Sequence, residues 1–187
     1  MKEINQAGVR LAREAAPGGL VAGVVGPLTE CPWGERSAHY EGQCSALADA
    51  GCDLLLLETF MEASDLLAAV GAARKTGLPV VGQLALTLDR GFDRVALHSE
   101  RLGLSVLGTN CVDPDQALRC LERVAKGAAL PLSAFPSAGL PGEERPPGAF
   151  ARSIEALVDA GARLVGGCCG TGPEHIRAAA KSLGKSR

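Results

Sequence analysis

Aromatic residues are scarce in this sequence. They make up 3% of the 187 residues, whereas 47% are hydrophobic. Any core must therefore be built mainly from aliphatic side chains. Basic residues are not in excess either, because 19 lysines and arginines face 21 aspartates and glutamates and the pI is near 5.9. This charge balance gives no reason to expect nucleic acid or an anionic membrane as a partner.

Long apolar runs are also absent. The longest, such as LVAGVVGPL at 20–28, fall far short of the roughly 18 residues that a membrane-spanning helix needs. The first residues, MKEINQAGVRLAREAAPGG, carry charges throughout and lack the apolar stretch of a signal peptide. These two absences predict a cytoplasmic protein that makes no contact with a membrane.

What the sequence does contain is a recurring unit: a short apolar run, a loop and an amphipathic stretch. The runs are almost continuously apolar, which is typical of strands buried on both faces of a parallel sheet. They lie at 20–26, 53–59, 78–86, 104–111, 130–136 and 162–168. Helices are predicted at 36–50, 62–76, 93–102, 113–126, 148–160 and 173–183, and a helix-like segment precedes the first strand.

Alternating strands and helices leave two architectures, an open doubly wound sheet or a closed barrel. No G-x-G-x-x-G motif follows the first predicted strand, so the dinucleotide-binding signature is missing. Polar residues gather instead at predicted strand ends, where TIM barrels carry their chemistry. They are Glu58, Asn110, Cys111, Ser137, Cys168 and Cys169. The sequence therefore favours a TIM (β/α)8-type barrel, here partial with about six βα units, since a full barrel has eight.

The seven cysteines favour free thiols or metal ligands over a disulfide framework. Cys44, Cys52 and Cys120 lie in apolar surroundings and are interpreted as small core residues. Cys31, in the loop TECPWGE, has no partner that the sequence reveals and is left unassigned.

Cys168 and Cys169 stand side by side in RLVGGCCGTGPEH, where a predicted strand gives way to a helix. The surrounding glycines let the chain turn, and TGPE predicts a helix start with Thr171 as N-cap and Glu174 completing a capping box. A third thiol, Cys111, ends the earlier strand LGTNC. Three thiolates from two strand ends would make a tetrahedral zinc site with one open position, which is the arrangement of a catalytic site.

Two other interpretations of these thiols stay open, a redox dithiol and a set of small buried side chains. His175, in the first turn of the last predicted helix, is either a further ligand or a surface or supporting residue. His39 and His98 lie in polar helical stretches and are interpreted as solvated.

Five segments resemble the homocysteine S-methyltransferase family, and together they run from about residue 20 to 180. They are VAGVVGPL, GCDLLLLETF, LGTNC, SAGLP and ARLVGGCCGTGPEHI. The sequences of these segments are most similar to the homocysteine-binding module that bacterial enzymes fuse to a methylenetetrahydrofolate reductase. The resemblance implies a (β/α)8 barrel whose zinc is held by Cys111, Cys168 and Cys169. It also implies that Glu58 binds the ammonium group of homocysteine.

The function that the resemblance implies is zinc-dependent methyl transfer to the homocysteine thiolate, which gives methionine. A free thiol has a pKa of about 8.5, and coordination to a metal deprotonates it at neutral pH. Asn110 is predicted to hydrogen-bond a ligand sulfur or the substrate, with a turn or capping role as the alternative. The methyl donor could be of the folate, betaine or S-methylmethionine type.

The chain also departs from the family pattern. The first two barrel strands are missing, Ser137 stands where relatives typically have asparagine in PNAGLP, and the segment between Leu86 and Leu104 is short. We therefore expect one homocysteine-binding domain, 1–187, without those two strands. The alternative is an inactive or incomplete zinc-binding barrel fragment that needs another polypeptide segment. Open sheet edges would then invite association.

Overall fold

Six parallel strands form a single sheet in the computed structural model, which describes residues 2–87, 91–96 and 99–185. The strands are β1 (Ala22–Val25), β2 (Leu54–Phe60), β3 (Val80–Leu84), β4 (Val106–Asn110), β5 (Leu132–Phe135) and β6 (Ala162–Val165). They lie in the order of the sequence, and every neighbouring pair is parallel. All six predicted strands are therefore confirmed.

Helices alternate with these strands, as the amphipathic stretches predict. They are α1 (Lys2–Ala15), α2 (Trp33–Asp49), α3 (Ala63–Arg74), α4 (Phe92–Ala96), α5 (Pro114–Val124), α6 (Pro147–Asp159) and α7 (Pro173–Ser182). The helix predicted at 93–102 is wrong in its length. It is replaced by the short α4 and a 3-10 turn, η2 (Ser99–Leu102), while residues 97–98 lie outside the described part of the chain.

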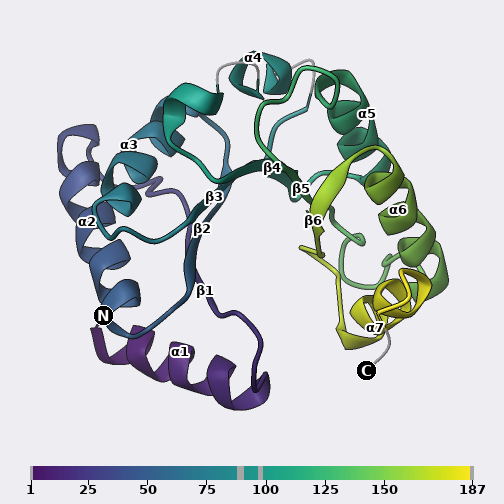
Figure 1. The fold of residues 1–187 in the computed structure, drawn as a ribbon, viewed down its shortest axis with the longest axis horizontal. Helices are drawn as coiled ribbons and strands as arrows, with labels where there is room; N and C mark the ends of the chain where they lie inside the picture. Colours follow the sequence, from purple (N-terminus) through teal and green to yellow (C-terminus); the bar gives the residue numbers. More distant parts are fainter. Residues whose placement is uncertain (1, 88–90, 97–98, 186–187) are drawn as a thin grey trace.

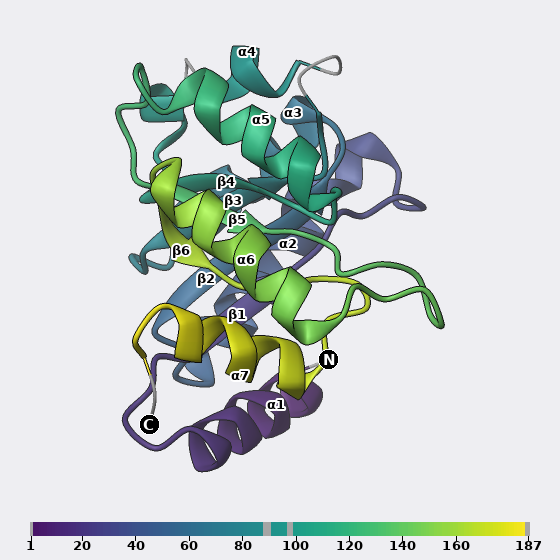
Figure 2. The ribbon, with the colours of Figure 1, turned by 90° about the vertical axis from the view of Figure 1, so that its right-hand side faces the viewer.

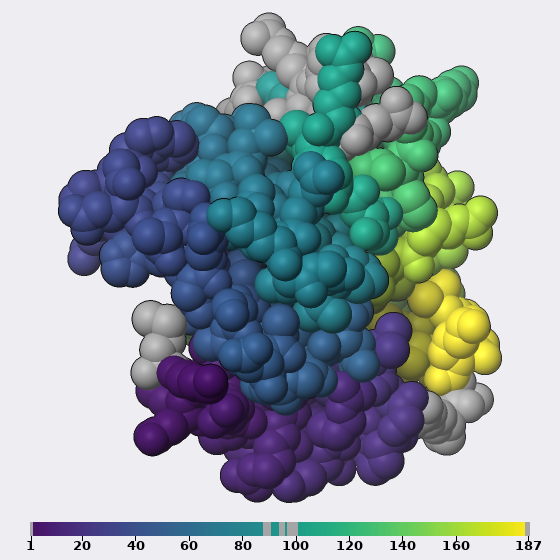
Figure 3. All heavy atoms as spheres, turned by 60° about the vertical axis from the view of Figure 1, so that its left-hand side comes forward, coloured from purple at the N-terminus to yellow at the C-terminus, as the bar shows by residue number. Residues whose placement is uncertain are grey.

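The sheet bends into an arc with the helices on its convex side (Figure 1). Within the described residues β1 and β6 pair with one neighbour each and not with one another. The arc is therefore a partial TIM barrel, as the sequence predicts. Helix α1 packs on α2 beside the β1 edge, and α7 packs on α6 beside the β6 edge (Figures 1 and 3).

The core lies between the convex face of the sheet and the helices, and it is mostly aliphatic. The largest buried side chains include four of the few aromatic residues, and none of these four is more than 1% exposed. They are Tyr40, Phe60, Phe92 and Phe150. Cys44, Cys52 and Cys120 are also buried there, so their interpretation as core residues is confirmed.

The concave face is closed in the middle of the arc and open at its two edges. Leu56 on β2 and Val81 on β3 are 7% and 4% exposed, whereas Val24 on β1 and Leu164 on β6 are 47% and 37% exposed. In a closed barrel such side chains fill the interior in layers. As for membranes, each helix in the described ranges is too short or too polar to span a bilayer.

Candidate metal centre

The three predicted ligand cysteines come from two strand ends that flank the end of β5. Cys111 follows β4, and its N–H donates to the carbonyl oxygen of Phe135 at 3.0 Å. Cys168 follows β6, and its N–H donates to the carbonyl oxygen of Pro136, also at 3.0 Å. Because both segments hydrogen-bond to the end of β5, they approach the same place from opposite sides.

The structure brings the three sulfurs together. The Sγ atoms of Cys111 and Cys169 are 3.3 Å apart, and those of Cys168 and Cys169 are 4.0 Å apart. All three lie within 4.8 Å of one another. Four ligands around zinc, with Zn–S bonds of about 2.3 Å, place their sulfurs roughly 3.5–4 Å apart. The thiols therefore need little movement to hold such an ion.

Two residues at this site have left-handed backbone angles, which non-glycine residues rarely adopt. Within the described chain, Thr59 (φ 66°) and Cys111 (φ 58°) are the non-glycine residues with positive φ. Such conformations cost about 1–3 kcal/mol each and persist only where the surrounding structure imposes them. At Cys111 the strained turn carries the chain from the end of β4 toward α5.

The electrostatics of Cys111 and Cys168 favour the neutral thiols unless a cation joins them. Burial, and then the neighbouring thiols, raise the pKa of Cys111 to about 12, and burial also raises the pKa of Cys168. Three thiolates could not share so small a space without a positive ion among them. Cys169 is exposed, so the triad is open to solvent on one side. The donor set, the spacing and the open side all fit zinc with one free position.

Asn110 connects this triad to the end of β2. Its side chain is fully buried, its Oδ1 accepts from the N–H of Thr59 at 2.9 Å, and its Nδ2 donates to Thr59 Oγ1 at 2.8 Å. The same Nδ2 lies 3.9 Å from Cys168 Sγ. Asn110 therefore connects the strained end of β2 to the sulfur of a candidate ligand, Cys168.

Glu58 immediately precedes Thr59 at the carboxyl end of β2. Leu57 packs in the core on the convex side, and successive strand residues point to opposite faces, so Glu58 faces the concave side. Burial raises the pKa of its carboxyl group. A half-buried carboxylate at this point is well placed to receive a cationic group of a ligand, because pairing with a cation offsets the cost of burying its charge.

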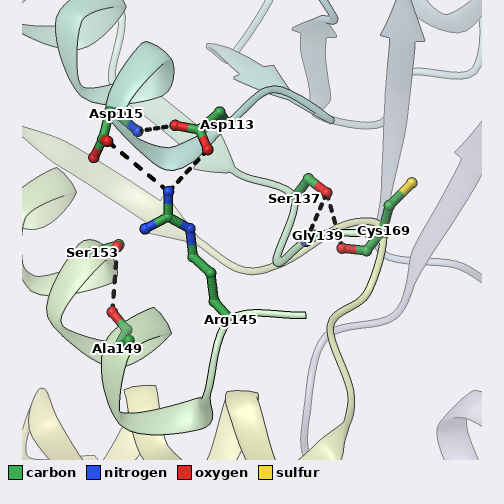
Figure 4. Close-up of polar contacts among 8 residues, drawn as sticks. All are labelled: Asp113, Asp115, Ser137, Gly139, Arg145, Ala149, Ser153 and Cys169. Carbon is green, nitrogen blue, oxygen red and sulfur yellow. Dashed lines mark hydrogen bonds and ion pairs between the residues drawn. The ribbon is translucent and has the colours of Figure 1, made fainter. Parts of the chain in front are cut away.

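The loop after β5 and the cysteine segment after β6 both lie beside α6 (Figure 2), and Ser137 joins the two (Figure 4). Its hydroxyl donates to the carbonyl oxygen of Cys169 at 3.1 Å and accepts from the N–H of Gly139 at 3.2 Å. The N–H of Ala138 donates to the same Cys169 oxygen at 2.7 Å. Serine thus makes a positioning contact here, although the family pattern has asparagine.

Arg145, at the far end of that loop, joins it to the Cys111 side (Figure 4). Its guanidinium lies 2.9 Å from Asp113 and 3.9 Å from Asp115. Asp113 caps α5 by accepting from the N–H of Asp115 at 2.9 Å. The loop between β5 and α6 therefore contacts both cysteine-bearing segments.

His175 is buried, not at the surface, and it fastens the start of α7 to the same loop. Its Nδ1 accepts from the N–H of Gly172 at 3.0 Å, so its proton is assigned to Nε2, which donates to the carbonyl oxygen of Arg145 at 2.7 Å. The N-cap is Gly172, so the prediction of Thr171 was wrong. His175, and not Glu174, bonds back to the cap, because its ring is held in the interior against Phe150. His175 is therefore a supporting residue, and it is not in the ligand cluster.

Sequence reasoning missed two residues of this site, Thr59 and Arg145. The threonine lies inside the ETF segment but bears no group that marks a site. Arg145 lies in an irregular stretch, and nothing in the residues around it points to Asp113. His98, interpreted from the sequence as solvated, lies outside the described residues.

A partial TIM barrel with three clustered thiols at the carboxyl ends of its strands defines a barrel with a candidate thiol-ligated metal site. The chain belongs to the homocysteine S-methyltransferase family, because the family model of that description matches residues 1–183.

Two curated relatives of the chain are methionine synthases. The chain is 29% identical to those of Mycobacterium leprae and Mycobacterium tuberculosis, over 99% and 98% of its length. It spans 18% of the length of either relative.

Among solved structures, the homocysteine methyltransferase MmuM from Escherichia coli is similar throughout. Its apo form has a TM-score of 0.80 and 28% identity, covering 97% of this chain and 73% of that one. A metallated form of the same enzyme has a TM-score of 0.79, with 95% and 69% covered.

Proposed function

We propose that this chain is the homocysteine-binding part of a zinc-dependent homocysteine S-methyltransferase, which transfers a methyl group to homocysteine and gives methionine. The observation that carries the proposal is the meeting of Cys111, Cys168 and Cys169 within 4.8 Å on an open face of the barrel. Family membership and the similarity to MmuM support it.

The cysteine triad would hold the zinc, and each neighbouring residue has a role that its geometry supports. When bound to three thiolates, zinc supplies a fourth position at which a substrate thiol loses its proton at neutral pH. Asn110 holds the end of β2 against the Cys168 sulfur. Ser137 holds the Cys169 carbonyl oxygen, so that the sulfurs keep their mutual distances.

Glu58 would bind the ammonium group of homocysteine. Its carboxylate faces the concave side of the same strand end that Asn110 holds, so it lies on the side from which a substrate enters. In the overall reaction the homocysteine sulfur gains the methyl group, the bond between that group and its donor breaks, and the thiol proton passes to solvent.

The methyl donor and the compartment belong to this proposal as well. A donor of the folate, betaine or S-methylmethionine type fits the reaction, and homocysteine is the common acceptor. We propose a cytoplasmic location and no nucleic-acid or membrane partner, which the charge balance and the absence of long apolar runs support.

An incomplete barrel that needs another polypeptide segment is the second candidate. The exposed concave residues Val24 and Leu164 favour it. So does an apolar cavity of about 470 Å³ beside the β6 edge, whose lining includes Leu164 and Ile176. We propose that a domain over 1–187 without the first two barrel strands binds zinc but needs a segment at these edges for full activity.

Calorimetry of the zinc-loaded chain with homocysteine tests the proposal. We expect one homocysteine to bind per triad, and Glu58→Gln to weaken binding by about 10–100-fold because an ion pair with the ammonium is lost. The matched control is Glu62→Gln, which removes a neighbouring carboxylate at the start of α3. Zinc retention without homocysteine binding would favour the incomplete barrel, and absence of bound zinc would favour the redox dithiol.

A further inference from the structure

A second cluster of metal-binding side chains lies at the start of α2, away from the cysteine triad. Cys31 Sγ, a carboxylate oxygen of Glu35 and an imidazole nitrogen of His39 lie within 4.8 Å of one another. Glu35 Oε2 and His39 Nε2 are 4.0 Å apart. Residues four apart share one face of a helix, and Cys31 stands just before the helix begins.

A buried network outside the cluster holds the loop that carries Cys31. The Nε of Arg36 donates to the Cys31 carbonyl oxygen at 3.0 Å, and its guanidinium pairs with Asp65 at 3.1 Å. The side chains of Arg36 and Asp65 are 18% and 7% exposed. The hydroxyl of Tyr40 donates to Asp65 at 2.9 Å and accepts from the Leu28 N–H at 3.1 Å. The loop is therefore fixed over the first turn of α2.

The charges around the cluster also suit a cation. Arg36 is a positive group that contacts the Cys31 segment, but its charge is paired with Asp65 and its guanidinium lies over the Trp33 ring, 5.2 Å from the centroid. Glu35 contributes a carboxylate, and Cys31 contributes a thiolate when a metal displaces its proton. The cluster therefore brings a carboxylate and, on metal binding, a thiolate to one point, which suits a divalent ion.

We propose that Cys31, Glu35 and His39 form a second metal site, for a divalent transition cation of the zinc class. Thiolate and imidazole ligands favour zinc over magnesium or calcium, and thiolate, imidazole and carboxylate are the three side-chain donors that zinc uses. A tetrahedral ion needs its donors roughly 3.3–3.8 Å apart, so small rotations of exposed side chains suffice. Water completes the fourth position.

The place of this site in the fold follows from the topology. The loop after β1 lies at the same end of the sheet as the cysteine triad, since all six strands are parallel. The start of α2 projects from the surface there (indigo, Figure 3). A bound ion would fasten the β1–α2 loop to its helix. This site goes beyond the proposed function, because it requires neither homocysteine nor the triad.

Titration of the metal-free, reduced full chain with Zn²⁺ against a chromophoric chelator tests the inference. We expect two zinc ions per chain, the second bound more weakly. Cys31→Ser and His39→Gln should each lose the weaker ion and keep the tighter one. Cys168→Ser should lose the tighter one and keep the weaker one. Glu30→Gln, in the same loop but outside the cluster, is the matched control and should keep both.

Co²⁺ substitution gives a second measurement, because each thiolate adds sulfur-to-cobalt absorption in the near ultraviolet. We expect Cys31→Ser to remove the part of this absorption that develops with the second equivalent. Binding of one ion by the wild-type chain, or of two by Cys31→Ser, would overturn the inference. Either result leaves the triad, and hence the proposed function, to be judged on Cys168→Ser alone.

Discussion

The two thiol-containing clusters lie at the same end of the sheet and are assembled in different ways. The triad joins Cys111 to Cys168 and Cys169, 57 and 58 positions further along the chain. Residues from the end of β2, the β5–α6 loop and the start of α7 brace it, namely Thr59, Ser137, Arg145 and His175. The cluster of Cys31, Glu35 and His39 lies within nine consecutive residues, on one helix turn and the loop before it.

This difference sets what each cluster can do. Distant segments that meet only in the folded barrel form a site whose geometry the whole fold maintains, and such preorganisation is what catalysis requires. A local cluster with exposed Glu35 and His39 side chains has to order them when the ion binds, which costs conformational entropy. We therefore expect the triad to bind metal more tightly, and only the triad to support chemistry.

Removing a triad sulfur should have the largest effect. Cys168→Ser replaces a soft thiolate by a hydroxyl, so zinc affinity at the triad should fall by at least ~100-fold and methyl transfer should be lost. Chelator competition and a methionine assay measure the two effects. Cys120→Ala is the matched control, because that buried cysteine lies outside both clusters. Equal loss in both variants would show a general folding defect instead.

Substitution of Asn110 should have the second largest effect, because its side chain connects the triad to the strand end that carries Glu58. Asn110→Ala should lower kcat/KM by about 10–100-fold while the zinc stoichiometry stays at the wild-type value. Kinetics and metal analysis on the same preparation separate a loss of activity from a loss of zinc. Thr109→Ala, which loses a buried hydrogen bond to the carbonyl oxygen of Leu84 on the neighbouring strand β3, is the control for stability. A parallel loss of zinc in Asn110→Ala would contradict a role at the substrate side.

Much of the fold could be predicted because apolar periodicity and parallel order are local signals. The apolar runs located all six strands, and Cys111, Cys168 and Cys169 could be placed together because the carboxyl ends of parallel strands meet at one edge. The prediction of one helix at 93–102 was wrong, because the apolar pattern did not reveal the break between α4 and η2.

The contacts that brace the site could not be predicted, because they depend on where loops cross. Arg145 reaches Asp113 across 32 positions, and His175 reaches the Arg145 carbonyl oxygen across 30. The N-cap of α7 is Gly172 and not the predicted Thr171 for the same reason. A tertiary contact with Phe150 fixes the His175 ring, and this contact could not be predicted from the sequence. The sequence revealed no partner for Cys31, because the group that binds its carbonyl oxygen is the Arg36 side chain. Arg36 is held in place by Asp65, which is distant in the sequence.

His175 tests how far the bracing of the triad depends on the loop between β5 and α6. His175→Phe keeps a ring against Phe150 but loses both hydrogen bonds, which are worth about 1 kcal/mol each. We expect a lower melting temperature and zinc affinity reduced by about tenfold, since the Cys168–Cys169 segment loses its anchor to Arg145. Phe150→Leu is the control, because it alters the same packing and keeps the hydrogen bonds. A wild-type affinity in His175→Phe would mean that Ser137 alone suffices.

Substitution of Tyr40, which supports the loop that carries Cys31, should have the smallest effect. This effect on stability should depend on pH. Burial is the main cause that raises the pKa of Tyr40 from 10 to about 12. Because the folded state holds the phenol in its neutral form, the stability from this group is complete below about pH 10 and is lost as the pH rises toward 12. Tyr40→Phe cannot ionise. It should be less stable than wild type by about 1 kcal/mol at pH 8, since Asp65 and the Leu28 N–H lose a partner. Urea unfolding at pH 8 and above pH 10 should show that difference shrink as the wild-type phenol titrates, and a constant difference would mean that Tyr40 ionises equally well in both states.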